Sequence, residues 1–106
     1  MTTTMDRLPE QGTDVWHLRL YVAGQSPKSL RALFNLQELC EHNLPGRYEI
    51  EVIDLVEHPA MAQIDDILAI PTLIRRIPVP VRRIFGDMSD TARVLGGLWL
   101  DPAHSG

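Results

Sequence analysis

The amino-acid sequence predicts one α/β domain with the thioredoxin-like element order β-α-β-α-β-β-α. Three observations lead to this fold class. The first half of the chain reads as a strand, a helix of about four turns and a second strand with short connections, which is typical of a parallel βαβ unit. Two short β-rich runs separated by prolines then predict a hairpin, and an amphipathic pattern near the end predicts a last helix. We expect the domain to span residues 15–100, between polar tails at 1–14 and 101–106.

The first strand and helix are predicted from the start of this region. Apolar and polar residues alternate in the first part of residues 15–22, and the last part of this run is wholly apolar. This pattern is typical of a strand that enters from an edge and ends inside a sheet. Gly24 then breaks the strand, Ser26 is suited to cap a helix and Pro27 to open it. The helix is expected to end near Asn43. Its apolar stripe is formed by Leu30, Leu33, Phe34, Leu36, Leu39 and Cys40.

The middle of the chain predicts a second strand and a hairpin. Residues 48–55 alternate and then become apolar, so they are expected to pair in parallel with the first strand. Pro59 is suited to begin a short helix. Residues 73–77 and 81–85 are expected to form the hairpin, whose connection 78–80 contains two prolines that cannot donate ladder hydrogen bonds.

The last helix is predicted from its capping residues and its apolar spacing. Ser89 is expected to be the N-cap, with Asp90 in the first turn. Two adjacent glycines, Gly96 and Gly97, weaken the helix. Its apolar positions are Ala92, Val94, Leu95, Leu98 and Trp99.

Composition limits the partners and sites that the chain can have. The sequence has 106 residues, a formal net charge of −4 and a pI near 5.4. Nucleic-acid binding needs a concentrated positive field, so we expect no nucleic acid among its main partners. No apolar run is long enough to span a membrane and the N-terminus lacks a secretory pattern, so we expect a cytoplasmic protein with no membrane partner. A single cysteine allows no intramolecular disulfide and no cysteine-based metal cluster.

A thiol enzyme of this fold would carry its reactive cysteine where the first strand meets the first helix, because the helix N-terminus stabilises a thiolate. The sequence has Ser26-Pro27-Lys28-Ser29 at that turn, and a serine hydroxyl cannot exchange with a disulfide. Cys40 falls in the apolar stripe of the helix and is expected to be a small buried hydrophobe. The histidines are scattered without ligand spacing. We therefore expect no catalytic, cofactor-binding or metal-binding residues.

Two groups of carboxylates could in principle carry acid–base chemistry. They are the adjacent pair Asp65-Asp66 and the looser pair of Asp87 with Asp90. A catalytic pair needs a cleft that shifts its pKa values, whereas acids in short helices and at helix starts are usually solvated caps. We expect solvated caps here.

Arginines provide the clearest candidate for a binding surface. Arg75-Arg76 and Arg82-Arg83 come from the two arms of the expected hairpin, which could place four guanidinium groups in one region of an acidic protein. Arginine suits bidentate contacts with carboxylates, which favours an acidic protein partner. A solvated edge strand protected by charge explains the same residues equally well.

Several blocks of sequence carry a family resemblance. In chain order they are Leu20–Gly24, Ser26-Pro27 with Ser29 and Arg31–Leu33, Val52–Asp54 with Pro59, Ile67–Leu73, and Pro78–Asp87. Together they resemble the KaiB family of bacterial circadian-clock-type systems over residues 15–98. The resemblance implies a thioredoxin-like fold and a regulatory protein without catalytic activity.

The resemblance also implies partners and a second fold. The main partner would be a KaiC-like ATPase ring. In complete clock systems, the ring-bound protein would also help to capture KaiA or to displace a KaiB-like sensor kinase domain. Members of the family interconvert between the thioredoxin-like form, which binds partners, and a tetrameric ground-state form with a rearranged C-terminal half. Short segments interrupted by proline and glycine are compatible with two packings of similar energy. We expect the monomeric thioredoxin-like form, with the homotetramer as the alternative.

By the same resemblance, the partner-facing residues are Arg31, Asp65, Asp66, Arg82 and Arg83. Gly97 and Trp99 occupy positions that tune the balance between the two folds. Two departures from the family pattern affect these expectations. Asp66 stands where the family commonly has lysine, so the cognate ring would carry a complementary change. Trp99 stands where the family commonly has aspartate, which favours a divergent paralogue.

Two other classes of function are alternatives to this binding module. One is a cysteine-poor thioredoxin-like enzyme, which would require an exposed, acidic Cys40 thiol. The other is a purely oligomeric structural protein, which would form a stable tetramer that no ring ATPase affects.

Overall fold

The predicted element order is confirmed by a computed structural model, which describes residues 15–99. The tails expected at 1–14 and 101–106, and residue 100, lie outside the described residues. The elements are β1 (Trp16–Val22), α1 (Pro27–Asn43), β2 (Tyr48–Asp54), α2 (Met61–Ile64), β3 (Thr72–Ile77), β4 (Arg82–Phe85) and α3 (Thr91–Trp99).

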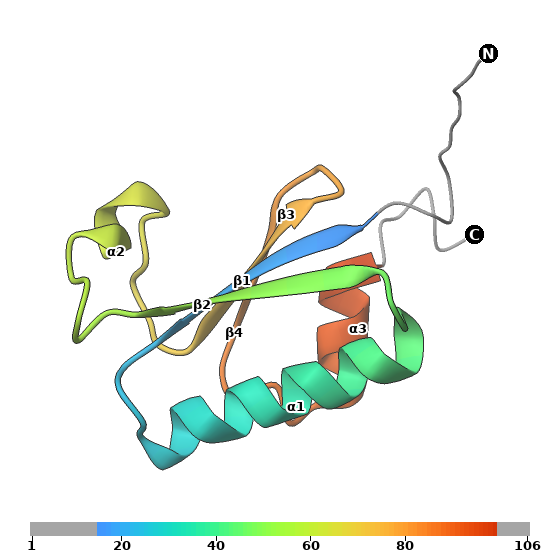
Figure 1. Cartoon of the computed structure of the whole chain (residues 1–106), viewed down its shortest axis with the longest axis horizontal. Helices are drawn as coiled ribbons and strands as arrows, with labels where there is room; N and C mark the ends of the chain where they lie inside the picture. Colours follow the sequence, from blue (N-terminus) through green and yellow to red (C-terminus); the bar gives the residue numbers. More distant parts are fainter. Residues whose placement is uncertain (1–14, 100–106) are drawn as a thin grey trace.

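The four strands form one mixed sheet in the order β2-β1-β3-β4. β1 pairs in parallel with β2, which confirms the predicted βαβ unit, and antiparallel with β3. β3 and β4 form the predicted antiparallel hairpin. β1 is therefore an inner strand, whose Leu20 lies opposite Val52 on one side and Leu73 on the other. Figure 1 shows α1 and α3 on the same side of this sheet and α2 away from them.

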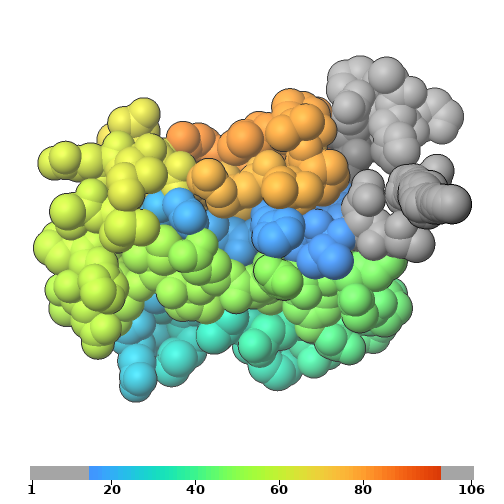
Figure 2. Space-filling model, turned by 45° about the horizontal axis from the view of Figure 1, so that its top comes forward, coloured from blue at the N-terminus to red at the C-terminus, as the bar shows by residue number. Residues whose placement is uncertain are grey.

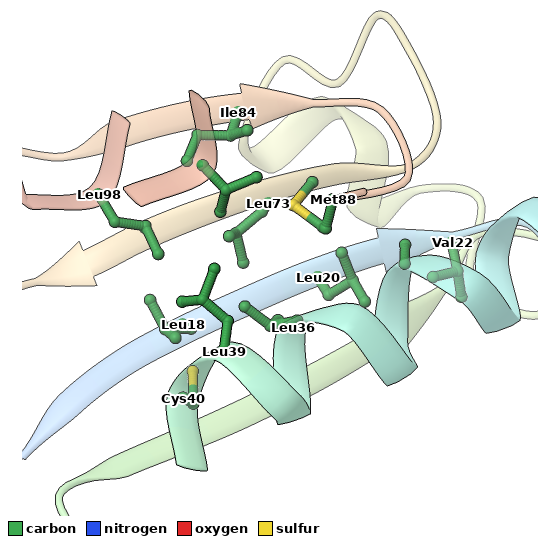
Figure 3. Packing of buried hydrophobic residues seen from close by; sticks show 12 residues of the cluster. Leu18, Leu20, Val22, Leu36, Leu39, Cys40, Leu73, Ile84, Met88 and Leu98 are labelled. Atoms are coloured by element: carbon green, nitrogen blue, oxygen red, sulfur yellow. The ribbon is translucent and has the colours of Figure 1, made fainter. Parts of the chain in front are cut away.

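The main hydrophobic core lies between the sheet and the two long helices. Leu36 and Leu39 of α1 point toward Leu18 and Leu20 of β1, and Leu98 reaches the same cluster from α3 (Figure 3). The other buried members are Val22, Ala32, Cys40, Leu73, Ile84, Met88 and Val94. Burial of this apolar surface is the main force that holds both helices to what we call the helix face of the sheet.

α1 begins as predicted, but it buries less of its apolar stripe than expected. The N–H of Ser29 donates to the Ser26 hydroxyl at 3.2 Å, so Ser26 is the N-cap, and Pro27 occupies the first turn. Leu30 and Phe34 were expected in the stripe, but they are 53% and 61% exposed. The stripe is wider than the surface that one sheet covers, so these two side chains face outward.

α3 begins one residue later than predicted. The N–H of Arg93 donates to the carboxylate of Asp90 at 3.1 Å, so Asp90 is the capping side chain and the prediction of Ser89 was wrong. The N–H of Ser89 instead donates to the carboxylate of Asp87 at 3.1 Å. Ser89 is therefore part of the turn that precedes the helix.

The opposite face of the sheet is covered only in part. Residues 55–71, which connect β2 to β3 and contain the four-residue α2, cross this face, and we call them the strap. Tyr21, Ile53 and Ile74 form a small buried cluster there, packed by partly buried Leu55, Met61 and Ile67. Figure 2 shows the strap as a yellow lobe beyond the orange hairpin, with blue atoms of β1 between them. We call this side the strap face. Within residues 15–99, no helix is long and apolar enough to cross a membrane.

Candidate functional site

The residues predicted to contact a partner lie on two different faces. Arg82 is in register with Arg75, and Arg83 with Ile74. Side chains alternate along a strand, so Arg82 lies on the helix face with Leu18 and Arg75, while Arg83 lies on the strap face. One flat partner surface therefore cannot contact both Arg82 and Arg83 through the same face of the sheet.

The hairpin therefore does not bring its four arginines together in one surface patch. Arg75 is 4% exposed, and its guanidinium donates to the backbone oxygens of Leu98 and, at 2.7 Å, Pro80. It also lies 5.5 Å from the centre of the Trp16 ring. Arg76 points to the opposite face of the sheet. The alternation of the strand splits each arginine pair, so Arg75 contributes to the fold rather than to a surface patch.

Arg31 is exposed on α1, on the helix face, and it has an intramolecular partner. Its Nε donates to Asp87 Oδ2 at 3.2 Å, and the amide of nearby Asn35 donates to the Asp87 carbonyl at 2.9 Å. Hydrogen bonds from Ser89, together with Arg31, hold the pKa of Asp87 below its ordinary value. Asp87 is therefore not a solvated cap but a charged contact that ties the β4–α3 turn to α1.

Asp65 is the centre of a charged network on the strap face. Its Oδ2 accepts from the Tyr21 hydroxyl at 2.6 Å and from Arg19 Nη1 at 2.9 Å, and its Oδ1 accepts from Arg76 Nη1 at 3.3 Å. Its side chain is only 12% exposed. Burial opposes ionisation, but the bonds from Tyr21 and Arg19 hold the pKa of Asp65 below its ordinary value. Asp65 is an ion-pair acceptor, and the expectation of a solvated cap was wrong for it.

Asp66 differs from its neighbour because its side chain faces solvent. Its backbone has a φ of 52°, in the left-handed region that aspartate tolerates better than most residues. Its carbonyl oxygen lies 3.5 Å from Arg83 Nη1, so the β4 arginine reaches the strap. Asp66 and Arg83 are thus two predicted partner-facing residues that lie together.

The strap also carries exposed apolar side chains on both sides of Asp66 in the sequence. Leu68 is 92% exposed, Ile64 is 63% exposed and Ile70 is 39% exposed, and we call these three residues the strap patch. On β4, Phe85 is exposed on the same face as Arg83. Sequence reasoning missed this group. The available signal was a run of four apolar residues, Ile67–Ile70, that ends at a proline and belongs to no long element.

The position of the reactive cysteine in thiol enzymes of this fold holds serines. The hydroxyls of Ser26 and Ser29 are 2.9 Å apart, and the N–H of Ala23 donates to Ser29 Oγ at 3.1 Å. Cys40 lies near the other end of α1 and is buried, and burial raises the pKa of its thiol to about 12. Within the described part of the chain, no group of three histidine, cysteine or carboxylate side chains could hold a metal ion.

One of the two predicted fold-balance positions lies at a tight contact. A Cβ added to Gly97 would stand 2.9 Å from both Cγ1 and Cδ1 of Ile84, so α3 packs closely on β4 at this glycine. Trp99 ends α3, and its side chain lies outside the described part of the structure.

Comparison with known proteins gives both a family and a fold. The family model described as the KaiB domain matches residues 19–100. The circadian clock oscillator protein KaiB of Prochlorococcus marinus (strain MIT 9211) is 53% identical over 83 residues, which cover 78% of this chain and 73% of that protein. The KaiB of strain MIT 9313 is 52% identical, with 78% and 70% covered.

Two solved structures are similar in fold at low sequence identity. The N-terminal domain of Synechococcus elongatus SasA superposes with a TM-score of 0.69 at 14% identity, over 90% of both chains. Mitochondrial thioredoxin 3 from Saccharomyces cerevisiae superposes with a TM-score of 0.62 at 17% identity, over 81% of this chain and 79% of the other. These likenesses establish the thioredoxin-like fold.

Proposed function

We propose, since the chain belongs to the KaiB family, that it is a non-catalytic clock-type regulator that binds a KaiC-like ATPase ring in its thioredoxin-like form. In systems that contain them, the bound chain would also capture KaiA or displace a KaiB-like sensor kinase domain. The absence of a cysteine from the turn at Ser26 supports a binding role over thiol chemistry.

The strap face supports this proposal best, and its most exposed apolar residue is the observation that carries it. Leu68 is 92% exposed and follows Asp66 by two residues in the strap, and the Asp66 carbonyl oxygen lies 3.5 Å from Arg83 Nη1. Large apolar side chains that are grouped with charged residues at a surface are typical of protein-binding sites, because a partner buries the apolar part and pairs with the rim. We propose that the strap patch, Asp66 and Arg83 form the contact with the ring.

Replacing Leu68 by serine tests this surface. Removing a nearly fully exposed leucine changes the free monomer little but removes apolar area from the proposed interface. We expect Leu68→Ser to weaken binding to the KaiC-like ATPase of the same organism, measured by size-exclusion chromatography with light scattering in the presence of nucleotide. The matched control is Val79→Ser, because Val79 is also exposed but lies in the hairpin connection away from the strap. Equal loss in both variants, or in neither, would refute the strap face as the site.

The resting form of the protein is a second part of the proposal. We propose that the free chain rests as a thioredoxin-like monomer of 12.0 kDa, and that the tetrameric form is the minor state. The continuous core between the sheet and α1 and α3 supports this form. Light scattering on the free protein tests it. A mass four times larger, with slow joining to the ring, would instead favour a fold switch that gates binding.

A further inference from the structure

The strap is held to the sheet much less firmly than the two long helices. Its only helix has four residues and none of them is buried. Apart from Pro71 at its end, which is fully buried, its apolar contacts with the sheet come from Leu55, Met61 and Ile67, which are only partly buried. Between its two ends, three of its backbone carbonyl oxygens accept hydrogen bonds from sheet side chains. Ala69 O accepts from the Thr72 hydroxyl at 2.5 Å, while Met61 O and Asp66 O make longer contacts with the Tyr21 hydroxyl at 3.4 Å and with Arg83 at 3.5 Å. Apolar burial alone therefore gives the strap little stability.

Ion pairs supply a second attachment, and they meet at one residue. Within residues 15–99, each ion pair between the strap and the sheet ends on Asp65. Arg19 and Tyr21 reach it from β1, and Arg76 reaches it from β3. Both oxygens of the carboxylate are engaged. We call Arg19, Tyr21, Asp65 and Arg76 the Asp65 clasp.

A contact within the sheet helps to hold Arg19 in position for Asp65. Arg19 Nε donates to Glu51 Oε1 of β2 at 2.9 Å, which leaves its Nη1 directed to Asp65. The Arg19 side chain is 15% exposed, so solvent screens its pairing less than it screens a surface pair. Because Arg19 is already held in place, it loses little conformational entropy when it binds the Asp65 carboxylate. The net free energy of that ion pair is therefore more favourable.

We propose that the Asp65 clasp holds the strap on the sheet, and that the strap opens as a unit of its own when the clasp is broken, while the helix face stays folded. The strap carries the strap patch, so the clasp also sets how Ile64, Leu68 and Ile70 are presented. The clasp is a property of the free protein, and its test is independent of which partner binds.

Hydrogen exchange on the free full-length chain tests this inference. Asp65→Asn keeps the size of the side chain but removes its charge, and Asp66→Asn is the matched control because that side chain is exposed and asparagine tolerates the left-handed backbone. The reporting amides are those of Ala62, Gln63 and Ile67, which donate within the strap. We expect their protection to fall by about ten-fold or more in Asp65→Asn, with α1 unchanged.

The outcomes separate the clasp from a general loss of stability. Unchanged strap protection in Asp65→Asn would overturn the proposal, as would an equal loss in α1 or in Asp66→Asn. Tyr21→Phe provides a second test if Asp65→Asn does not fold, because it removes only a hydroxyl and keeps the ring in its cluster. That hydroxyl donates to Asp65 at 2.6 Å, and its other strap contact, with Met61 O at 3.4 Å, is much longer. A smaller loss of protection confined to the strap is expected in that variant, and no loss there would likewise overturn the clasp.

Discussion

Arg82 and Arg83 are consecutive residues of β4 whose side chains lie on opposite faces of the sheet. Arg82 shares the helix face with buried Arg75, and its own Nε is buried and has no hydrogen-bond partner among residues 15–99. Arg83 is exposed and reaches the strap at Asp66. A substitution at Arg82 therefore tests the helix face as a binding surface, and a substitution at Arg83 tests the strap face.

Charge reversal at these two positions should have different effects. We expect Arg83→Glu to weaken binding to the KaiC-like ring by about ten-fold or more, because it reverses a charge beside the strap patch, with the free energy of unfolding changed by less than about 0.5 kcal/mol. Arg82→Glu should weaken binding less. Titration calorimetry and urea unfolding measure the two quantities. A larger loss of affinity in Arg82→Glu would move the interface to the helix face.

A pair of cysteines at the start of α1 should behave as a thioredoxin-like pair. The hydroxyls of Ser26 and Ser29 are 2.9 Å apart in the turn where thiol enzymes of this fold carry their cysteines. We expect Ser26→Cys combined with Ser29→Cys to form an intramolecular disulfide on mild oxidation, because the two side chains already approach each other. Thiol counting before and after oxidation measures this. The single variants are controls. Counted after unfolding, so that buried Cys40 is included, the double variant should fall from three free thiols to one, and three remaining thiols would contradict the geometry of the turn.

The buried thiol should make stability depend on alkaline pH. Burial, and then the charge of Glu41, raises the pKa of Cys40 from its ordinary value of 9.0 to about 12. The folded state holds the proton more tightly than the unfolded state does, so this contribution to stability is complete below about pH 9 and is lost as the pH rises toward 12. We expect the free energy of unfolding to fall more steeply between pH 8 and 10.5 in the native chain than in Cys40→Ala.

The same comparison has an internal control. Tyr48, whose pKa a hydrogen bond with Glu41 raises to about 12, is present in both proteins. The charge of Cys40 is the smallest of the causes that raise the Tyr48 pKa, so the difference between the two slopes belongs mainly to the thiol. A reagent for free thiols should also react slowly with the folded native chain and rapidly after unfolding. If the free energy of unfolding fell equally steeply with pH in both proteins and the folded native chain were labelled quickly, the Cys40 thiol would be accessible rather than buried.

The two adjacent glycines of α3 form a matched pair. A Cβ at Gly96 would meet no atom within 4 Å, whereas a Cβ at Gly97 would stand 2.9 Å from buried Ile84. Gly96→Ala should stabilise the domain by about 0.5–1 kcal/mol through helix propensity alone. Gly97→Ala gains the same helix propensity but must displace Ile84. We therefore expect its free energy of unfolding to be at least about 1 kcal/mol lower than that of Gly96→Ala. Urea unfolding measures both, and equal values would mean that α3 does not pack tightly on β4.

Much of the fold follows from local signals in the sequence. Ser26 and Pro27 predicted the start of α1, because capping and first-turn preferences act within a few residues. The order of strand, four-turn helix and strand with short connections predicted the parallel pairing of β1 and β2. The last helix was placed one residue early, because Ser89 and Asp90 are both good caps and only the turn geometry selects Asp90.

The candidate site was harder to predict because it depends on contacts between distant residues. Asp65 meets Arg19 and Tyr21, which are 46 and 44 residues away in the chain, and no local pattern indicates this meeting. The burial of Arg75 likewise depends on where α3 ends relative to β3. In contrast, the separation of Arg82 from Arg83 follows from the alternation of a strand and could have been predicted once the hairpin was accepted.

The partly covered sheet has a consequence for how the protein responds to its surroundings. On one side of β1, attachment comes mainly from apolar burial, which weakens on cooling and is insensitive to moderate salt. On the other side, the Asp65 clasp contributes charge, which dissolved salt screens where the pairs are solvent-accessible. Cooling should therefore act mainly on the helix face, where the larger apolar cluster lies, and ionic strength mainly on the strap face, so the two conditions would affect opposite sides of a single strand.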